Sequence, residues 1–335
     1  MRQDSTLYRN LGNRDNNTLL RTIYHHREEH VIKTYVALAT AVLFWGSSFV
    51  ATKLVLQEFS PQAYMFIRFA IASTAFVAVL WYRGFPKLPG SVHLRLAAIA
   101  VFEPGLYFVF ETGGLALTTA PKASLIIATT PVAVALLSRL VLGERMEIRV
   151  ALGGAASLAG VALLVIADRR AGLLEAGAGM GDVLILGAVV SAAAYIILAR
   201  SLSARLDSVQ LTAYQVIYGT VFFLPLFLLR PAVPAIGQVG VEVIGSLLFL
   251  SIFATVAAFL SYNYALSQIP AARAGVFLNA IPVVTALVAW PVLGEVLSPA
   301  QALGGVLVLG GMTFANSRRK REVLPVEGLL PGDGG

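Results

Sequence analysis

The sequence predicts an all-α integral membrane protein with ten transmembrane helices, arranged as two inverted five-helix repeats. Three observations lead to this fold class: an apolar composition, long apolar segments and a duplicated motif. Of the 335 residues, 57% are hydrophobic and only 13% are charged, whereas soluble domains carry about 25% charged residues. Because these charges are too few to cover a water-facing surface, most of the chain is expected to lie in lipid.

Apolar segments of the length that a bilayer requires follow one another along the chain. A hydrocarbon core about 30 Å thick needs roughly 20 apolar residues in a helix. Continuously apolar runs favour helices over barrel strands, in which polar and apolar residues would alternate. Polar, Gly or Pro residues separate the expected segments, which are 35–56, 62–82, 94–117, 121–142, 148–167, 180–200, 209–229, 240–267, 271–293 and 298–316.

Lys and Arg are unevenly distributed between the two ends of these segments. With the N-terminus placed in the cytoplasm, 18 basic residues fall on the inner side, 4 fall on the outer side and 3 lie within helices. Basic loops tend to remain cytoplasmic. The sequence therefore predicts that both termini are cytoplasmic, with a polar tail over 1–34 and a basic, then disordered tail over 317–335.

One motif occurs twice. Residues 128–160 align with 279–311 at an offset of 151, and 14 of the 33 positions are identical. The identities include a proline, Pro131 or Pro282, followed by a Val-Leu-Gly-Glu and an Ala-Leu-Gly-Gly sequence. Chance matching of apolar residues does not easily produce matched Pro, Gly-Glu and Gly-Gly in one register, so the motif indicates an internal duplication.

The duplication divides the membrane part into two repeats, 35–167 and 180–316. Because five is an odd number, the second repeat must enter the membrane from the opposite side. Inverted repeats are typical of transporters, whose substrate site lies between the repeats near the bilayer midplane. A weaker match of 53–62 with 200–209 has an offset of 147. The alternative is a duplication that produced only a scaffold.

Several motifs, taken together and in order, resemble those of a known family. WGSSF at 45–49, SPQAYMFIRF at 60–69, APKASLIIATTPV at 120–132 and the two LGE-to-GG segments are similar to those of the EamA family, within the drug/metabolite transporter superfamily. The resemblance covers residues 35–316. It implies ten helices in inverted repeats, movement of amino acids or related metabolites, often outward, and a place in the bacterial inner (plasma) membrane.

Glu103, Tyr107 and Glu111 form the sharpest polar group in the sequence. Their spacing of four residues places them on one face of a regular helix. An ionisable group at the centre of a membrane helix costs about 2.5–3.5 kcal/mol, so it usually faces a cavity or a partner. We expect a polar stripe along the substrate path; the alternative is a structural ion pair or helix–helix hydrogen bonds.

Other polar and aromatic residues in the middle of apolar segments complete the expected cavity between the repeats. Tyr262 lies at the repeat position of Glu111, so the two halves differ chemically there. The sequence does not decide whether a glutamate carries a proton or attracts a substrate ammonium group. The predicted substrate-binding residues are Trp45, Ser48, Glu103, Tyr107, Glu111, Tyr195, Tyr262 and Asn279.

Pro131 and Pro282 lie at matched positions and are expected to break their helices. A proline inside a helix frees the carbonyl four residues earlier, here that of Ile127 or Leu278. Broken helices near the midplane are where transporters bind their cargo. The alternative is a pair of kinks that only shape helix packing.

Charged and small residues elsewhere allow more than one interpretation. Arg68 is expected to pair with a glutamate, to bind a substrate carboxylate or to be structural, and Lys53 and Arg139 to snorkel toward the bilayer surface. Small residues let helices approach closely. We therefore expect packing, and leave a homodimer face open, at Gly153, Gly160, Gly304 and Gly311.

Several function classes lack their characteristic residues. The chain has no cysteine, which excludes disulfides and thiolate metal sites, and no phosphate-binding loop or metalloprotease motif is present. We expect no catalytic residue, cofactor, metal site or nucleic-acid partner, and an amino-acid-like substrate, with proton coupling left open. The alternatives are a membrane enzyme acting on lipid-linked substrates and a receptor that does not transport.

Overall fold

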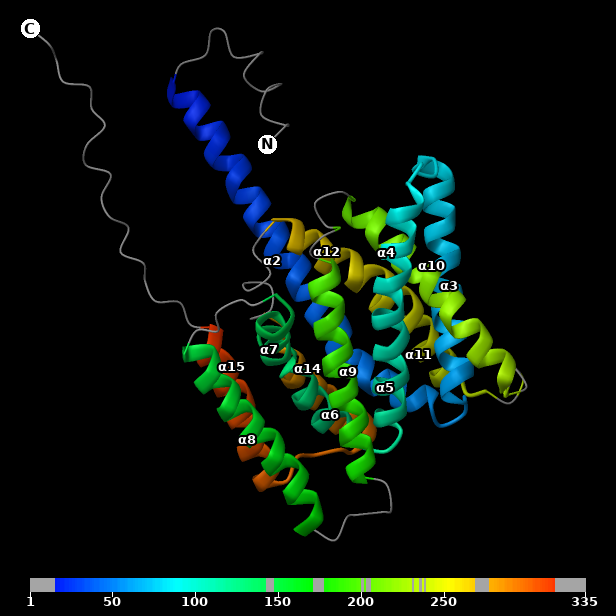
Figure 1. The fold of residues 1–335 in the computed structure, drawn as a ribbon, viewed down its shortest axis with the longest axis vertical. Coiled ribbons are helices and arrows are strands. Elements are labelled where there is room, and N and C mark those ends of the chain that lie inside the picture. The colour runs from blue at the N-terminus through cyan, green and yellow to red at the C-terminus, as the bar shows by residue number, and fades with distance from the viewer. Residues whose placement is uncertain are drawn as a thin grey trace, which may run out of the picture.

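The computed structural model describes residues 16–142, 148–170, 178–199, 202, 206–230, 232–234, 237, 239–268 and 277–316. Within these ranges every regular element is helical (Figure 1). Seven helical stretches are long and apolar enough to cross a bilayer, and three shorter apolar helices accompany them. The all-helical prediction is confirmed for the described residues.

The first half of the chain begins with a helix longer than expected. α2 starts at Asn16, so residues 16–34, expected as part of a tail, continue the first apolar segment as helix. Ser60 caps the next helix by accepting a hydrogen bond from the Ala63 amide at 3.3 Å. The elements are α2 (Asn16–Val55), α3 (Pro61–Arg83), α4 (Gly90–Ala100), η1 (Val101–Leu106), α5 (Tyr107–Leu115), α6 (Ala120–Ile127), α7 (Thr130–Leu142) and α8 (Ile148–Arg170).

The second half follows the same order. Asp207 and Gln210 form a reciprocal capping box at the start of α10. The expected segment 271–293 is described only from residue 277. The elements are α9 (Ala178–Ala199), α10 (Ser208–Leu229), α11 (Val241–Phe249), η3 (Leu250–Ala257), α12 (Ala258–Gln268), α14 (Ile281–Leu293) and α15 (Pro299–Asn316).

A wide, π-helical turn interrupts the third expected segment of each half. These turns, η1 and η3, overlap at the repeat offset of 151. In η1, Glu103 leaves helical geometry (φ −146°, ψ 116°), and Pro104, which follows it, has no amide to donate. The expectation that Glu103 and Glu111 lie on one uninterrupted helical face is therefore wrong.

Equivalent helices of the two halves pack against each other in opposite directions. On α3 and α10, Phe66 stacks on Phe227 with 4.7 Å between ring centroids, and the Ser73 hydroxyl lies 2.7 Å from that of Thr220. The partner's residue number falls as that on α3 rises, so the two helices are antiparallel. Ser73 and Thr220 are themselves equivalent at the offset of 147.

α8 and α15, the last helices of the two halves, pair in the same way (Figure 1). Gly153 faces the backbone of Gly311, and a β-carbon added at Gly160 would lie 2.6 Å from the carbonyl oxygen of Gly304. The matched glycines thus allow backbone contact within one chain. This contact occupies the face that the sequence left open for a homodimer.

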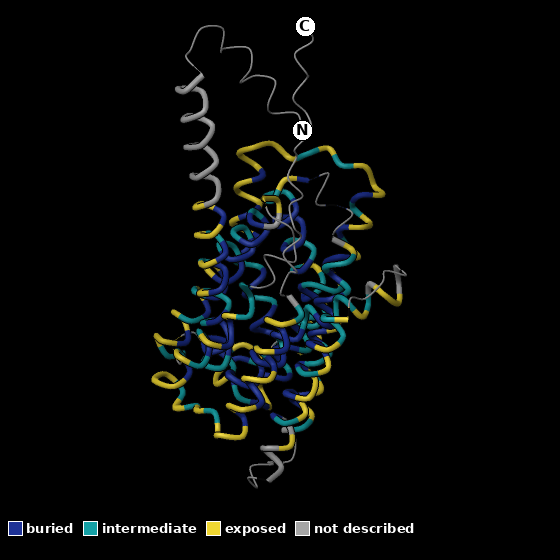
Figure 2. The backbone as a smooth tube through the Cα atoms, turned by 90° about the vertical axis from the view of Figure 1, so that its left-hand side faces the viewer, coloured by how far each residue is buried: buried dark blue, intermediate teal, exposed yellow. Residues whose placement is uncertain are grey.

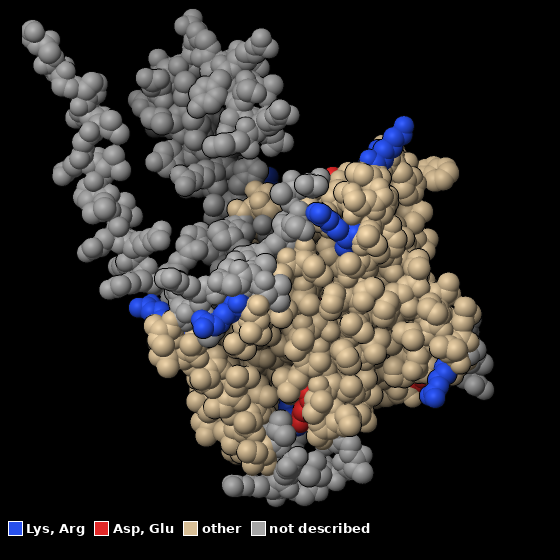
Figure 3. Space-filling model, in the orientation of Figure 1, with Lys and Arg blue, Asp and Glu red and all other residues tan. Residues whose placement is uncertain are grey.

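The outside of the bundle is apolar over its middle. Buried residues lie inside the bundle and exposed residues outside it (Figure 2). Large apolar side chains well inside helices, such as Val190, Val221 and Leu287, are at least 59% exposed. On the face seen in Figure 3, most of the described Lys and Arg side chains lie around the margins of the molecule, and the middle of the face is largely uncharged. Exposed apolar surface of this extent fits contact with lipid.

Replacement of Gly160 by alanine should destabilise the protein, because the new methyl group would meet backbone atoms of α15 that cannot move aside. Overpacking of this kind costs about 1–3 kcal/mol. Gly310→Ala is the control, since nothing lies within 4 Å of a β-carbon added there. Thermal unfolding of the purified protein in detergent should show a lower midpoint for Gly160→Ala alone. Equal midpoints would contradict the α8–α15 contact.

Candidate functional site

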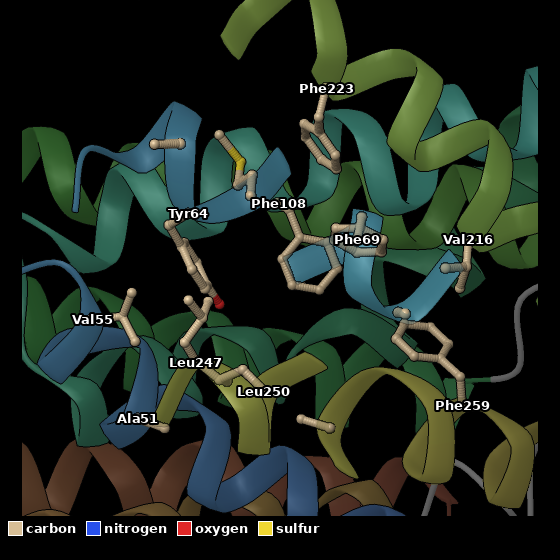
Figure 4. Close-up of a cluster of buried hydrophobic side chains, with 14 of the residues drawn as sticks. Ala51, Val55, Tyr64, Phe69, Phe108, Val216, Phe223, Leu247, Leu250 and Phe259 are labelled. Atoms are coloured by element: carbon tan, nitrogen blue, oxygen red, sulfur yellow. The ribbon is translucent and has the colours of Figure 1, made fainter. Parts of the chain in front are cut away.

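Arg68 on α3 is buried inside the bundle and is only 2% exposed. Its Nε donates to the Thr255 hydroxyl at 2.8 Å, and its Nη1 donates to the Tyr64 hydroxyl at 2.7 Å. Its guanidinium carbon lies 4.5 Å from the centroid of the Phe108 ring. Figure 4 shows the Tyr64 hydroxyl directed into the cluster that includes Phe108. Hydrogen bonds and a cation–π contact thus replace the water lost by this charge.

Glu111 on α5 supplies the opposite charge. It is 4% exposed, interacts electrostatically with Arg68, and accepts a hydrogen bond from the Thr112 hydroxyl at 3.1 Å. Tyr64 extends this group to α2, because its hydroxyl lies 2.9 Å from that of Thr52. Of the roles expected for Arg68, the structure shows a structural network of hydrogen bonds. Glu111 lies within electrostatic range of Arg68 but does not form a direct ion pair with it.

Glu103 belongs to a second group, on the other side of Tyr107. It lies within electrostatic range of the hydroxyls of Tyr107, Tyr195 and Tyr262. Tyr107 also interacts with Glu111, so it connects the two groups. Glu103 is partly exposed, and among the described residues no lysine or arginine forms an ion pair with it.

The two wide turns accept hydrogen bonds from the opposite half of the chain. Gln215 Nε2 on α10 donates to the Glu103 carbonyl in η1 at 3.2 Å. Trp45 Nε1 on α2 donates to the Ala254 carbonyl in η3 at 3.1 Å. Glu103 and Ala254 are equivalent at the offset of 151, so the contacts are reciprocal. The Trp45 ring also packs on Tyr262, with 5.1 Å between centroids.

Ser48 and Asn279, also predicted to bind substrate, make no hydrogen bond between the two halves of the chain to another predicted site residue within the described ranges. The Ser48 hydroxyl donates to the Trp45 carbonyl at 2.7 Å, one turn earlier on the same helix. The side-chain nitrogen and oxygen of Asn279 are buried without a hydrogen-bond partner among the described residues. The preceding residues, Phe277 and Leu278, pack in the cluster that contains Trp45 and Tyr262.

Both expected proline breaks lie at the start of a helix. α6 ends at Ile127, α7 begins at Thr130, and Pro131 lies in its first turn. The Thr130 hydroxyl donates to the Ile127 carbonyl at 2.6 Å, so a side chain satisfies the carbonyl that the proline frees. Pro282 likewise lies in the first turn of α14. The helices end and restart at these positions and are not merely kinked.

Tyr64, Gln215 and Thr255, and the wide turn after Glu103, were not identified as parts of the site from the sequence. Tyr64 lies four residues before Arg68, a spacing at which helical side chains meet. The Pro-Gly that follows Glu103 is a break signal. Gln215 lies at the repeat position of Arg68, at the offset of 147. Thr255 had no such signal, because its partner is 187 residues away.

A separate set of charges lies at one end of the bundle. Lys53 Nζ lies 2.7 Å from Glu295 Oε1 and donates to the Thr118 carbonyl at 2.8 Å. The other Glu295 oxygen accepts from the Ala120 amide at 2.8 Å. The Lys53 ammonium is thus neutralised by Glu295 at the end of the bundle, and its snorkelling to the bilayer surface stays a prediction. Its repeat counterpart, Arg200, lies outside the described residues.

A second ion pair lies beside the first. Lys122 Nζ is 2.7 Å from Asp182 Oδ2, and the two side chains are 1% and 3% exposed. The Thr118 hydroxyl donates to Asp182 Oδ1 at 3.1 Å. These contacts join α2, α6, α9 and the end of α14 at one side of the molecule.

Replacement of Lys122 by methionine should strongly destabilise the chain, because the Asp182 charge would remain buried without its lysine partner. Removing one partner of a buried ion pair typically costs about 3–5 kcal/mol. The double variant Lys122→Met with Asp182→Leu should recover much of this loss, since neither charge remains. Thermal unfolding of the three proteins measures both effects. A single variant as stable as the native chain would contradict the buried pair.

Comparison with known proteins gives a family match over most of the chain. The EamA-like transporter family matches residues 32–166 and, a second time, residues 179–317. An uncharacterized transporter of Archaeoglobus fulgidus is 33% identical over 291 residues, which cover 86% of this chain and 98% of that protein. The uncharacterized transporter YetK of Bacillus subtilis is 26% identical over 296 residues, covering 86% and 88%.

One relative has a more specific name, and one solved structure has a similar fold. A probable terminal-alkyne amino-acid exporter of Streptantibioticus cattleyicolor is 28% identical over 293 residues, covering 87% of this chain and 96% of that protein. A crystal structure with 21% sequence identity matches 84% of this chain and 96% of the other with a TM-score of 0.61. The chain is a multi-pass membrane protein that belongs to the EamA-like transporter family.

Proposed function

We propose that this protein is a secondary transporter that exports small polar metabolites, most simply amino acids or related compounds, by alternating access between its two halves. The observation that carries the proposal is the pair of interior glutamates. Glu103 lies near tyrosines of the other half, and Glu111 lies within electrostatic range of Arg68, which donates a hydrogen bond to Thr255 of the other half. Ionisable groups inside a membrane bundle usually mark a transport path. Relatives named as transporters, one of them a probable amino-acid exporter, support it.

The proposed topology has ten membrane crossings in two inverted repeats, 35–167 and 180–316, with both termini cytoplasmic. Antiparallel packing of equivalent helices and the two successive family matches support inversion. Charge supports the orientation. Arg83, Lys87 and Arg95 lie at the proposed cytoplasmic end, whereas both lysines of the ion pairs at the opposite end are neutralised by acidic partners. We also propose a place in the inner (plasma) membrane, which the transporter relatives support.

Alternating access requires that one half move against the other at low cost. Equivalent residues meet in the α3–α10 pair, at Ser73 and Thr220, so the pseudo-twofold axis passes there and the contact can persist during rocking. At the wide turns, single hydrogen bonds from Trp45 and Gln215 connect the halves. Each such hydrogen bond contributes about 0.5–1.5 kcal/mol, so breaking these two bonds when the halves move costs little free energy.

Flux measurements test the site. In proteoliposomes, efflux of labelled amino acids should fall about tenfold or more in Glu103→Gln and in Glu111→Gln, because each change removes an interior charge. Glu242→Gln is a matched control, since Glu242 is exposed in the first turn of α11. Unchanged flux in both interior variants, with normal folding, would remove the assignment of the site.

Cysteine labelling tests the topology, because the native chain has no cysteine. Nothing lies within 4 Å of a β-carbon added at Gly90 or Gly237, so Gly90→Cys and Gly237→Cys should fold normally. A membrane-impermeant maleimide should label Gly237→Cys in intact cells and Gly90→Cys only after permeabilisation. Labelling of both from the same side would contradict the proposed crossings.

A further inference from the structure

The two interior glutamates differ in what compensates their charge. Glu111 has Arg68 within electrostatic range and a hydrogen bond from Thr112. Among the described residues, Glu103 has no basic partner and its carboxylate accepts no hydrogen bond. A carboxylate in a low-dielectric interior needs a compensating group. That group is therefore missing from the described part of the chain at Glu103 and present at Glu111.

The surroundings of Glu103 are aromatic. Tyr107, Tyr195 and Tyr262 approach it from three helices, and Trp45 packs against Tyr262 in a tilted arrangement, with a 59° angle between the ring planes. The faces of aromatic rings attract cations, and their electron density adds to the field of a nearby carboxylate. A carboxylate with several tyrosines around it is an arrangement suited to an ammonium group.

Glu103 is partly exposed, and two of its electrostatic neighbours lie on α9 and α12 in the other half of the chain. Gln215 holds the backbone here through the Glu103 carbonyl, and its side chain also faces Tyr195. The carboxylate is thus positioned while its own oxygens stay free for a ligand.

From this geometry we infer that Glu103, Tyr195 and Tyr262 form a subsite for the ammonium group of the cargo. The inference rests on the proposed transport function and narrows it: cargo compounds carry a primary ammonium group, and compounds with only a carboxylate are rejected. Arg68 and Glu111 are not part of this subsite, because Arg68 already donates hydrogen bonds to Tyr64 and Thr255, and Glu111 has Arg68 within electrostatic range.

Ligand binding to the purified full chain tests the subsite. The probes are leucine, phenylalanine and lysine, each with its decarboxylated amine (isoamylamine, phenethylamine and cadaverine) and its N-acetyl derivative, which lacks the α-ammonium group. Thermal stabilisation should occur with amines or amino acids and should be lost on acetylation of leucine or phenylalanine. Affinity should fall about tenfold or more in Glu103→Gln, less in Glu103→Asp, which keeps the charge, and not at all in Glu242→Gln.

Three results of the binding experiment would overturn the subsite. They are no stabilisation of the native chain by any ammonium compound, equal stabilisation by acetylated leucine or phenylalanine, and undiminished binding in Glu103→Gln with a normal melting temperature. If Glu103→Gln binds the ammonium compounds undiminished but changes the pH dependence of flux, Glu103 would be assigned to proton transfer instead. Flux of compounds without an ammonium group would overturn the subsite and leave the transport function standing. Ammonium-dependent binding without flux would contradict the transport function and leave the subsite standing.

Discussion

Lipid offers no hydrogen-bond partner, so each charge and each free backbone group inside this chain must be satisfied by the chain itself. Arg68 shows how this constraint organises the centre. Its guanidinium needs Tyr64 from its own helix, Thr255 from the other half and the compensating charge of Glu111. A single buried charge thereby ties both halves together, and the same requirement at Glu103 is left for a ligand to meet.

The duplication explains why the contacts between the halves occur in related pairs. A wide turn in each half exposes a carbonyl, and a side chain from the other half donates to it: Gln215 to Glu103, and Trp45 to Ala254. The surrounding side chains have diverged, since a glutamate in one half corresponds to an alanine in the other. Symmetric backbone breaks with asymmetric side chains suit a transporter, which needs two similar states but one binding site.

The sequence predicted the features that depend on local composition, such as the helices. It did not predict the contacts between residues that are distant along the chain. Apolar runs predicted the helices, and the isolated charges at Glu103 and Glu111 pointed to the interior. The wide turn at Pro104 was missed, because the spacing of the glutamates was interpreted on a regular helix although the Pro-Gly signal was present. Ion pairs such as Lys53–Glu295 join residues 242 apart, and helix patterns do not encode which distant charges meet.

The contact between Ser73 and Thr220 offers the most direct test of two inverted halves that move about a shared axis. In the cysteine-free chain, Ser73→Cys with Thr220→Cys should form a disulfide under mild oxidation, because the two hydroxyl oxygens lie 2.7 Å apart. Flux measured before and after oxidation should be similar, since residues on the axis stay together while the halves rock. Failure to form the bond, or complete loss of flux when it forms, would contradict the account.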